Sequence, residues 1–146
     1  MTDPRTVIEQ ADTATAAHHV DGFMALVADD AVFRGPGGVD GYEVRGHEAI
    51  RAMAESFEVA YPDMKVEVRG RYVDGDTVVS EVLSTATHTG PITLATGGRL
   101  EATGRTLRER SVYIHRVVNG KIVEETVYYD RHTVLEQLGQ LPTAHG

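Results

Sequence analysis

The chain has 146 residues, no cysteine and a formal charge of −8 at pH 7. This length suits a single domain, residues 1–146, that is large enough to enclose a core with a cavity inside it. Without cysteine the chain has no disulfide framework, no thiolate nucleophile and no thiolate metal site. The acidic charge and the lack of a basic face argue against a nucleic-acid partner.

The sequence also carries no signal for a membrane. No apolar run approaches the roughly 18 residues that a helix needs to cross a bilayer. The first residues, Met1–Arg5, lack the basic segment and the apolar core of a secretory signal. We therefore expect a cytoplasmic protein with no membrane partner.

Two helices are predicted near the N-terminus. Asp3-Pro4 is typical of a helix start, because the carboxylate accepts from free backbone N–H groups and proline fits the first helical position. A second, short helix is predicted to begin at Asp21 and to end at Asp29-Asp30. The apolar run Ala31–Phe33 then predicts a short strand.

A third helix is predicted after a flexible glycine-rich loop. Tyr42–Arg45 returns as a strand, and Gly46 opens a helix whose buried stripe is Ile50, Met53 and Phe57. Pro62 ends this helix, because the residue before proline avoids helical angles.

The hydrophobic period changes to two residues at Met64, where apolar and charged side chains begin to alternate. This alternation predicts a half-buried strand. Asp74-Gly75-Asp76 predicts a turn, and Thr77–Thr87 predicts a longer strand that His88-Thr89-Gly90-Pro91 closes. A glycine-rich connection through Gly97-Gly98 follows.

A long hairpin organises the C-terminal third of the chain. Two alternating runs, Leu107–Val118 and Lys121–Tyr129, flank Asn119-Gly120, a dipeptide that tolerates the positive φ angles of a hairpin turn. A short helix follows, with Asp130 as its N-terminal cap and Gly139 as its left-handed end. Helices followed by antiparallel strands indicate an α+β fold with a strongly curved sheet.

Several motifs of the chain resemble those of the SnoaL-like polyketide cyclases, a family of the nuclear-transport-factor-2-like superfamily. They are Thr103-Gly104-Arg105, Arg116–Ile122, Asp130 and Gln137-Leu138-Gly139, together with Tyr61-Pro62-Asp63 and His88-Thr89-Gly90. The resemblance covers nearly the whole chain. It implies a cone-shaped, curved antiparallel sheet with three N-terminal helices and a short C-terminal helix. It is less specific for the reaction, because this fold also hosts isomerases, dehydratases, epoxide hydrolases and binding proteins.

The resemblance also implies positions for the reactive groups, and four of them differ here. The family's acid/base aspartate on the last strand falls on Val127, which cannot move a proton. A glutamine and a histidine of the family pattern fall on Ser111 and Tyr113, and an asparagine that reaches the pocket falls on Phe33. Any catalysis must therefore proceed without a carboxylate at position 127.

The register of the hairpin decides which side chains face the pocket. A three-residue turn with a bulge at Gly120 would pair Ser111 with Val127 and Tyr113 with Glu125. A two-residue turn would instead place Tyr113 opposite Thr126. The resemblance favours the first register, in which Glu109 and Tyr129 join the same face.

Four residues are the candidates for catalysis: Tyr113, His88, Glu125 and Asp130. A carboxylate opposite a tyrosine is a possible acid/base pair, and histidine at a strand end titrates near neutral pH. For Asp130 a role as helix cap is sufficient, and the alternative that it is the catalytic carboxylate stays open. His115 lies on the Tyr113 face, nearer the turn, where solvent exposure is the more common outcome.

The candidate substrate contacts are Phe33, Phe57, Ser111, Val127 and Tyr129. We expect no cofactor and no metal, because no pair of His, Asp or Glu has the spacing of a metal site. The sequence thus predicts a cofactor-independent cyclase or isomerase of secondary metabolism that acts on a hydrophobic, polyketide-like small molecule. The alternative is a binding protein without catalysis, which Val127 and Phe33 favour. We also expect a homodimer that forms through the outer face of the hairpin.

Overall fold

The fold is that of a computed structural model, which describes residues 2–37, 40–93 and 98–141. It contains four helices, α1 (Pro4–Ala16), α2 (Val20–Met24), α3 (His47–Ala60) and α4 (Arg131–Gln137). The strands of the main sheet are β1 (Val27–Gly35), β2 (Tyr42–Arg45), β3 (Lys65–Asp74), β4 (Thr77–Thr87), β7 (Thr106–Val118) and β8 (Lys121–Tyr129). Two short strands, β5 (Ile92–Thr93) and β6 (Arg99–Leu100), form a separate ribbon. The predicted α+β architecture is confirmed.

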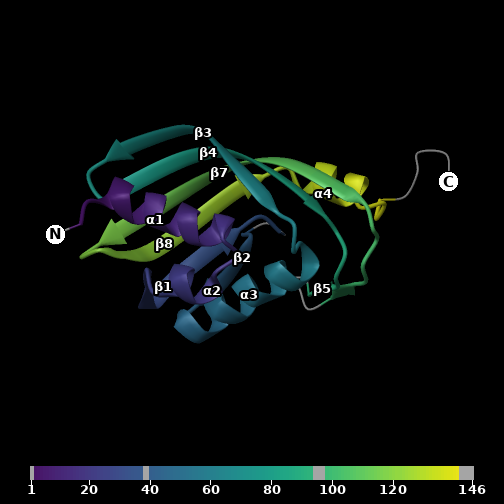
Figure 1. The fold of residues 1–146 in the computed structure, drawn as a ribbon, viewed down its shortest axis with the longest axis horizontal. Coiled ribbons are helices and arrows are strands. Elements are labelled where there is room, and N and C mark those ends of the chain that lie inside the picture. Colours follow the sequence, from purple (N-terminus) through teal and green to yellow (C-terminus); the bar gives the residue numbers. More distant parts are fainter. Residues whose placement is uncertain (1, 38–39, 94–97, 142–146) are drawn as a thin grey trace.

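The main sheet has the order β2-β1-β8-β7-β4-β3. All of its neighbouring strands run antiparallel except β1 and β8, which are parallel. The long strands twist strongly, and α1, α2 and α3 lie over one face of the sheet while α4 lies at the opposite end (Figure 1). The sheet and the three helices therefore enclose the interior between them.

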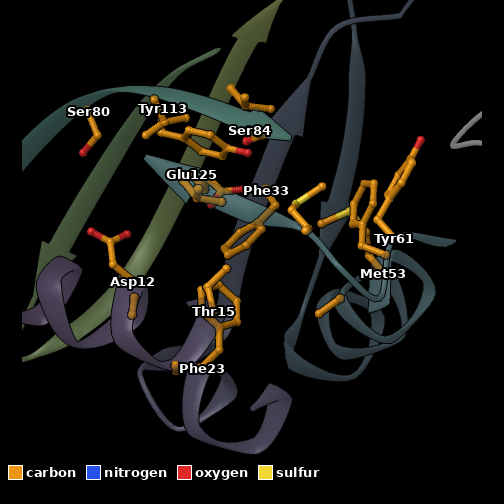
Figure 2. A pocket seen from close by; sticks show the side chains of 18 of the residues that line it. Asp12, Thr15, Phe23, Phe33, Met53, Tyr61, Ser80, Ser84, Tyr113 and Glu125 are labelled. Atoms are coloured by element: carbon orange, nitrogen blue, oxygen red, sulfur yellow. The ribbon is translucent and has the colours of Figure 1, made fainter. Parts of the chain in front are cut away.

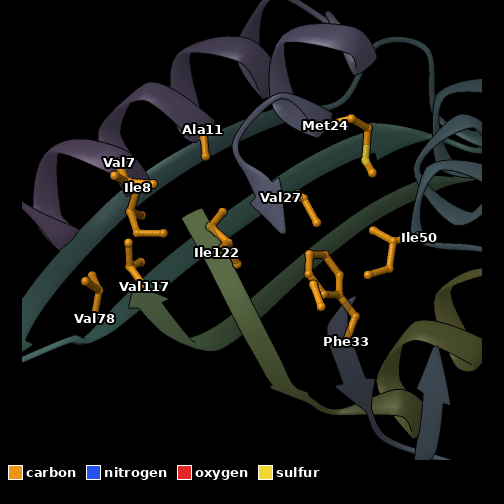
Figure 3. Packing of buried hydrophobic residues seen from close by; sticks show 11 residues of the cluster. Val7, Ile8, Ala11, Met24, Val27, Phe33, Ile50, Val78, Val117 and Ile122 are labelled. Carbon is orange, nitrogen blue, oxygen red and sulfur yellow. The ribbon is translucent and has the colours of Figure 1, made fainter. Parts of the chain in front are cut away.

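The main hydrophobic core joins α1 to the strands beneath it. Val7, Ile8 and Ala11 of α1 pack with residues of the sheet and of α2 and α3 (Figure 3). Asp3 caps α1 as predicted, because its side chain accepts from the backbone N–H of Thr6. A second cluster, which contains Ala60, Tyr61, Ala86 and Leu107, lies toward α4. The space between the two clusters is where a cavity can form.

The family motif Gln137-Leu138-Gly139 has a structural role at the C-terminal end. The Gln137 amide pairs with the backbone of Arg108, accepting from its N–H at 2.7 Å and donating to its carbonyl at 3.0 Å. The side chain thereby satisfies backbone groups of β7 beyond the last paired residue of β8. Leu138 is 3% exposed, and Gly139 has the left-handed φ of 72° that ends the helix.

Two sequence-based predictions were wrong: the extent of the second helix and the burial of β3. Helix α2 begins at Val20 and ends at Met24, so Asp29-Asp30 lies within β1 and not at a helix end. The sheet tolerates these two charges because they are exposed, at the point where the register between β1 and β8 shifts. Strand β3 is mostly exposed and not half-buried, since it is an edge strand of the sheet. The Gly97 part of the glycine-rich connection lies outside the described residues.

Both pairings considered for the β7–β8 hairpin were also wrong, although the expected face is correct. Asn119 and Gly120 form a two-residue turn with φ of 52° and 75°, and Val118 pairs with Lys121. The register then shifts between Arg116 and Val117, and the extra residue belongs to β8. As a result Ser111 pairs with Tyr129, Tyr113 with Val127, and His115 with Glu125.

Candidate functional site

A cavity of about 260 Å³ lies between the three N-terminal helices and the concave face of the sheet. Its wall is formed mainly by apolar and aromatic side chains, with a few polar groups directed inward (Figure 2). All three phenylalanines and four of the six tyrosines of the chain contribute to this wall. A mostly apolar cavity with a few convergent polar groups is the usual form of a small-molecule site.

A histidine and a carboxylate meet on the wall near the hairpin turn. The Nε2 atom of His115 lies 2.8 Å from Oε1 of Glu125, and the two residues face each other across β7 and β8. Both side chains are largely buried, with exposed fractions of 10% and 13%. The other ring nitrogen, Nδ1 of His115, is buried and has no hydrogen-bond partner among the described residues. We call His115 and Glu125 the hairpin pair.

Tyr113 packs directly against the hairpin pair. Its ring stacks on the His115 ring, with centroids 5.8 Å apart and an angle of 4° between the planes. Burial raises the pKa of Tyr113 well above its ordinary value, and the charge of Glu125 acts in the same direction. The Tyr113 phenol therefore stays protonated at neutral pH and can donate a hydrogen bond.

A second carboxyl group, Glu109, lies on β7. It is on the same face of the strand as Tyr113 and further from the hairpin turn. The hydroxyl of Ser111 donates a hydrogen bond to Glu109 Oε1. Burial raises the pKa of Glu109, and this hydrogen bond opposes the effect only in part. A carboxyl in this setting holds a proton more readily than an exposed one.

Three further tyrosines surround this part of the wall: Tyr42, Tyr61 and Tyr129. Burial raises the pKa of each phenol, to about 12 for Tyr61. Within the described part of the chain, none of these hydroxyl groups has a hydrogen-bond partner in the protein. The phenols are thus neutral groups that remain available to a bound molecule.

His88, a predicted catalytic residue, does not line this cavity. Its side chain is fully buried, and Nδ1 accepts from the backbone N–H of Thr103 at 3.3 Å and lies 3.0 Å from the Thr103 hydroxyl. The ring also packs against Tyr61, with centroids 5.5 Å apart. Burial lowers the pKa of His88. These contacts describe a neutral histidine that joins the end of β4 to the segment before β7.

Asp130, another predicted catalytic residue, lies outside the cavity and caps α4. Its carboxylate accepts from the backbone N–H of Thr133 at 3.1 Å and from the Thr133 hydroxyl at 2.6 Å. These hydrogen bonds lower the pKa of Asp130. The group is an exposed anion that is already engaged at the helix end.

Four of the five candidate substrate contacts lie on the cavity wall. The side chains of Phe33, Phe57, Val127 and Tyr129 line the cavity together with Tyr113 and Glu125. Ser111 is buried on the same face and contacts Glu109, but it is not itself part of the cavity wall. The alternation of side chains along the hairpin was the signal that grouped these residues.

His115 is the main cavity residue whose burial the sequence did not reveal. It was expected in solvent because it lies near the turn, yet it is 8% exposed. Helix α1 covers this end of the sheet, and α1 is brought there by tertiary packing alone. Tyr42 and Tyr61 were likewise not predicted to meet the hairpin, because they lie far from it in the chain.

Among the residues that the structure describes, no group of three His, Asp or Glu side chains could hold a metal ion. In the same part of the chain, no helix is both long and apolar enough to span a bilayer.

The cavity between a curved sheet and three helices defines a class of small, cone-shaped α+β proteins. The family model described as SnoaL-like polyketide cyclase matches residues 5–138, and the chain belongs to this family. A comparison with curated proteins finds no significant match.

Solved structures share this fold. IdmH from Streptomyces antibioticus, a proposed polyketide cyclase, is 26% identical with a TM-score of 0.74, over 94% of this chain and 99% of that one. AclR from Streptomyces galilaeus, a proposed hydroxylase, is 24% identical with a TM-score of 0.77, over 96% and 87%. A proposed SnoaL-like cyclase from Jannaschia sp. CCS1 is 17% identical with a TM-score of 0.81, over 95% and 93%. Family and neighbours together support a small-molecule enzyme of this superfamily.

Proposed function

We propose that this protein is a cofactor-independent enzyme that cyclises or isomerises a hydrophobic, polyketide-like small molecule by proton transfer. The observation that supports this proposal most directly is the hairpin pair, a histidine and a glutamate 2.8 Å apart in a mostly apolar cavity. A positioned acid/base group of this kind contributes roughly 10²–10⁴-fold to a reaction rate. Such an enzyme would act in the cytoplasm, in secondary metabolism.

The geometry of the pair supports a separate role for each member. An ionised Glu125 can only accept a hydrogen bond, so Nε2 of His115 carries the proton that it donates. Nδ1 of His115 then carries a free lone pair, and it has no hydrogen-bond partner among the described residues. In the proposed mechanism a shift of the His115 ring brings Nδ1, which is buried in this structure, to the substrate, where it removes a proton next to a carbonyl. Glu125 stabilises the imidazolium that forms.

The same pair explains how the chain can function with valine at position 127. The family pattern places a histidine at position 113 and an aspartate at position 127, two positions that face each other here. His115 and Glu125 form the next pair on the same face, because a step of two residues along each strand preserves direction and pairing. The acid/base groups would thus lie one pair closer to the turn.

Tyr113 completes the proposed site. A protonated phenol that stacks on the base can donate to the substrate oxygen on which negative charge develops. The proposed roles are therefore base for His115, orientation for Glu125 and oxyanion stabilisation for Tyr113.

The second candidate function is a binding protein without catalysis, which Val127 and Phe33 favour as apolar replacements in the wall. A thermal-shift screen of polyketide-like ligands, followed by turnover assays of every ligand that binds, separates the two functions. Turnover that His115→Gln abolishes supports the enzyme. Tight binding without conversion of any ligand supports the binding protein.

We also propose that the protein is a homodimer. On the outer face of the hairpin, Val112 pairs with the 60% exposed Tyr128, next to the half-buried Ile114. An exposed apolar patch of this kind is typical of an interface between copies. Sedimentation at micromolar concentration should give a dimer, and Tyr128→Asp should give the 15.9 kDa monomer. A wild-type chain that sediments only as a monomer would refute the dimer.

A further inference from the structure

The cavity wall carries several carboxyl groups and no lysine or arginine. The carboxyl groups belong to Asp12, Glu58, Glu109 and Glu125. Three of them have a basic partner: Arg71 lies 2.5 Å from Asp12, His18 lies 2.8 Å from Glu58, and His115 lies 2.8 Å from Glu125. The fourth, Glu109, forms no ion pair with any residue in the described ranges.

No lysine or arginine among the described residues forms an ion pair with Glu109, although Arg69, Arg108 and Arg110 line a second pocket to which Glu109 also contributes. Residues 1, 38–39, 94–97 and 142–146, which lie outside the described ranges, contain neither residue type. Within the described ranges the one hydrogen bond to its carboxyl group comes from the uncharged hydroxyl of Ser111. Glu109 is therefore a largely buried acidic group with no lysine or arginine at ion-pair distance in the described ranges.

Aromatic rings surround this acidic group. Tyr42, Tyr61, Tyr113 and Tyr129 line the same cavity as Glu109, and Tyr129 pairs with Ser111, the residue that donates to Glu109. Aromatic faces attract cations, and they do so more strongly where water is excluded. A carboxyl group among several such rings is an arrangement that suits a positively charged nitrogen.

We propose that the ligand of this cavity carries a protonated amine, which binds beside Glu109 among the tyrosine rings, while its apolar body packs against Phe33 and Val127. The ammonium group supplies the ion-pair partner that Glu109 lacks among the described residues. The free-energy cost of removing the ammonium group from water is offset by the carboxylate and the rings. A carboxylate ligand of the same size meets the opposite conditions. It is repelled by Glu109 and finds no lysine or arginine on the described wall.

This inference specifies the substrate class of the proposed enzyme, and it rests on the proposed function only in taking the cavity as the ligand site. Independent support for that choice comes from Tyr42, Tyr61 and Tyr129, which line the cavity with hydroxyl groups that have no hydrogen-bond partner among the described residues.

Three probes with one skeleton test the charge preference: 2-naphthylmethylammonium, 2-naphthylmethanol and 2-naphthoate. Their dissociation constants would be measured by calorimetry at pH 7.5 with the wild-type chain, Glu109→Gln and Glu124→Gln. Glu124 is the matched control, because it lies outside the cavity wall and its replacement changes the net charge equally. Benzylammonium serves as a smaller cationic probe.

We expect the wild-type chain to bind the naphthyl ammonium at least tenfold more tightly than the alcohol, with naphthoate weakest. Glu109→Gln should lose this tenfold preference, and Glu124→Gln should keep it. Three outcomes overturn the proposal: equal or tighter binding of the alcohol or naphthoate, a preference that survives Glu109→Gln, or no binding of either ammonium probe.

A further variant separates this proposal from the proposed function. His115→Gln should abolish turnover but preserve the preference for the ammonium probe. If the preference is absent while turnover depends on His115, the amine proposal fails and the proton-transfer enzyme stands. If the preference is present but no ligand is converted, the enzyme proposal fails and the amine site stands.

Discussion

Nε2 of His115 lies 2.8 Å from Oε1 of Glu125, one residue pair closer to the hairpin turn than Tyr113 and Val127. We predict that His115→Gln and Glu125→Gln each lower turnover by roughly 10²–10⁴-fold, because either change removes the base or its orientation. The double variant should be little worse than the single ones, since the two residues act as a unit. Initial rates with a converted ligand measure this effect. Full activity in His115→Gln would rule out the proposed base.

Tyr113→Phe tests the phenol separately from the ring. The variant keeps the stack on His115 and removes a hydroxyl that has no protein partner among the described residues. We therefore expect a loss of stability below about 1 kcal/mol. The turnover number should fall by roughly 10²–10³-fold, the cost of removing one oxyanion donor. Urea unfolding and steady-state kinetics measure the two effects. A lower melting temperature with unchanged turnover would assign Tyr113 a structural role only.

Val127→Asp restores a carboxyl group at the family position. Because Val127 is 6% exposed, the new group costs about 1–3 kcal/mol as a buried polar group, and burial raises its pKa in the folded state. The folded variant then holds its proton more tightly than the unfolded chain does, so stability falls as the pH rises above about 3.9. Denaturation should therefore show a larger loss at pH 8 than at pH 5.

Val127→Asn is the control for this prediction, since it is polar but does not ionise. Its loss of stability relative to the wild type should be the same at both pH values. A pH-independent loss in Val127→Asp would show that the new carboxyl is solvated.

His88 should make the stability of the protein depend on pH. Burial lowers its pKa in the folded state, so as the pH falls below about 6.5 the unfolded chain binds a proton that the folded chain does not. The contribution of neutral His88 to the free energy of unfolding should therefore be fully present above that pH and should decrease below it. His88→Gln should cost about 1–3 kcal/mol at pH 8 and reduce the slope between pH 7 and 5.5. His132→Gln, which replaces an exposed histidine, should leave the slope unchanged.

Asp130 distinguishes a helix cap from a catalytic acid. Asparagine caps a helix about as well as aspartate, so Asp130→Asn should keep both the melting temperature and turnover, whereas Asp130→Ala should lower the melting temperature. Thermal melts of the two variants, with rates at a temperature where both are folded, provide the comparison. Loss of turnover in Asp130→Asn with an unchanged melting temperature would make Asp130 the catalytic acid.

Local signals in the sequence predicted much of the fold. Asp3-Pro4, Asn119-Gly120 and Asp130 each have a conformational preference that depends on a few neighbouring residues, and all three behave as predicted. The burial of β3 was not predictable in this way. Val66 and Val68 are each 39% exposed because β3 is at an edge of the sheet, a position that strand alternation does not reveal.

The hairpin shows where the sequence stops being informative about the site. Alternation along the strands determined that Glu109, Tyr113 and Glu125 share a face, because side-chain direction repeats every two residues. The pairing of His115 with Glu125 depends on one extra residue in β8, and bulges have no reliable local signal. The burial of His115, and the convergence of Tyr42 and Tyr61 on Glu109, come from helices and strands distant in the chain. Only their tertiary packing removes these groups from water, and it is this removal that gives the hairpin pair and Glu109 their chemistry.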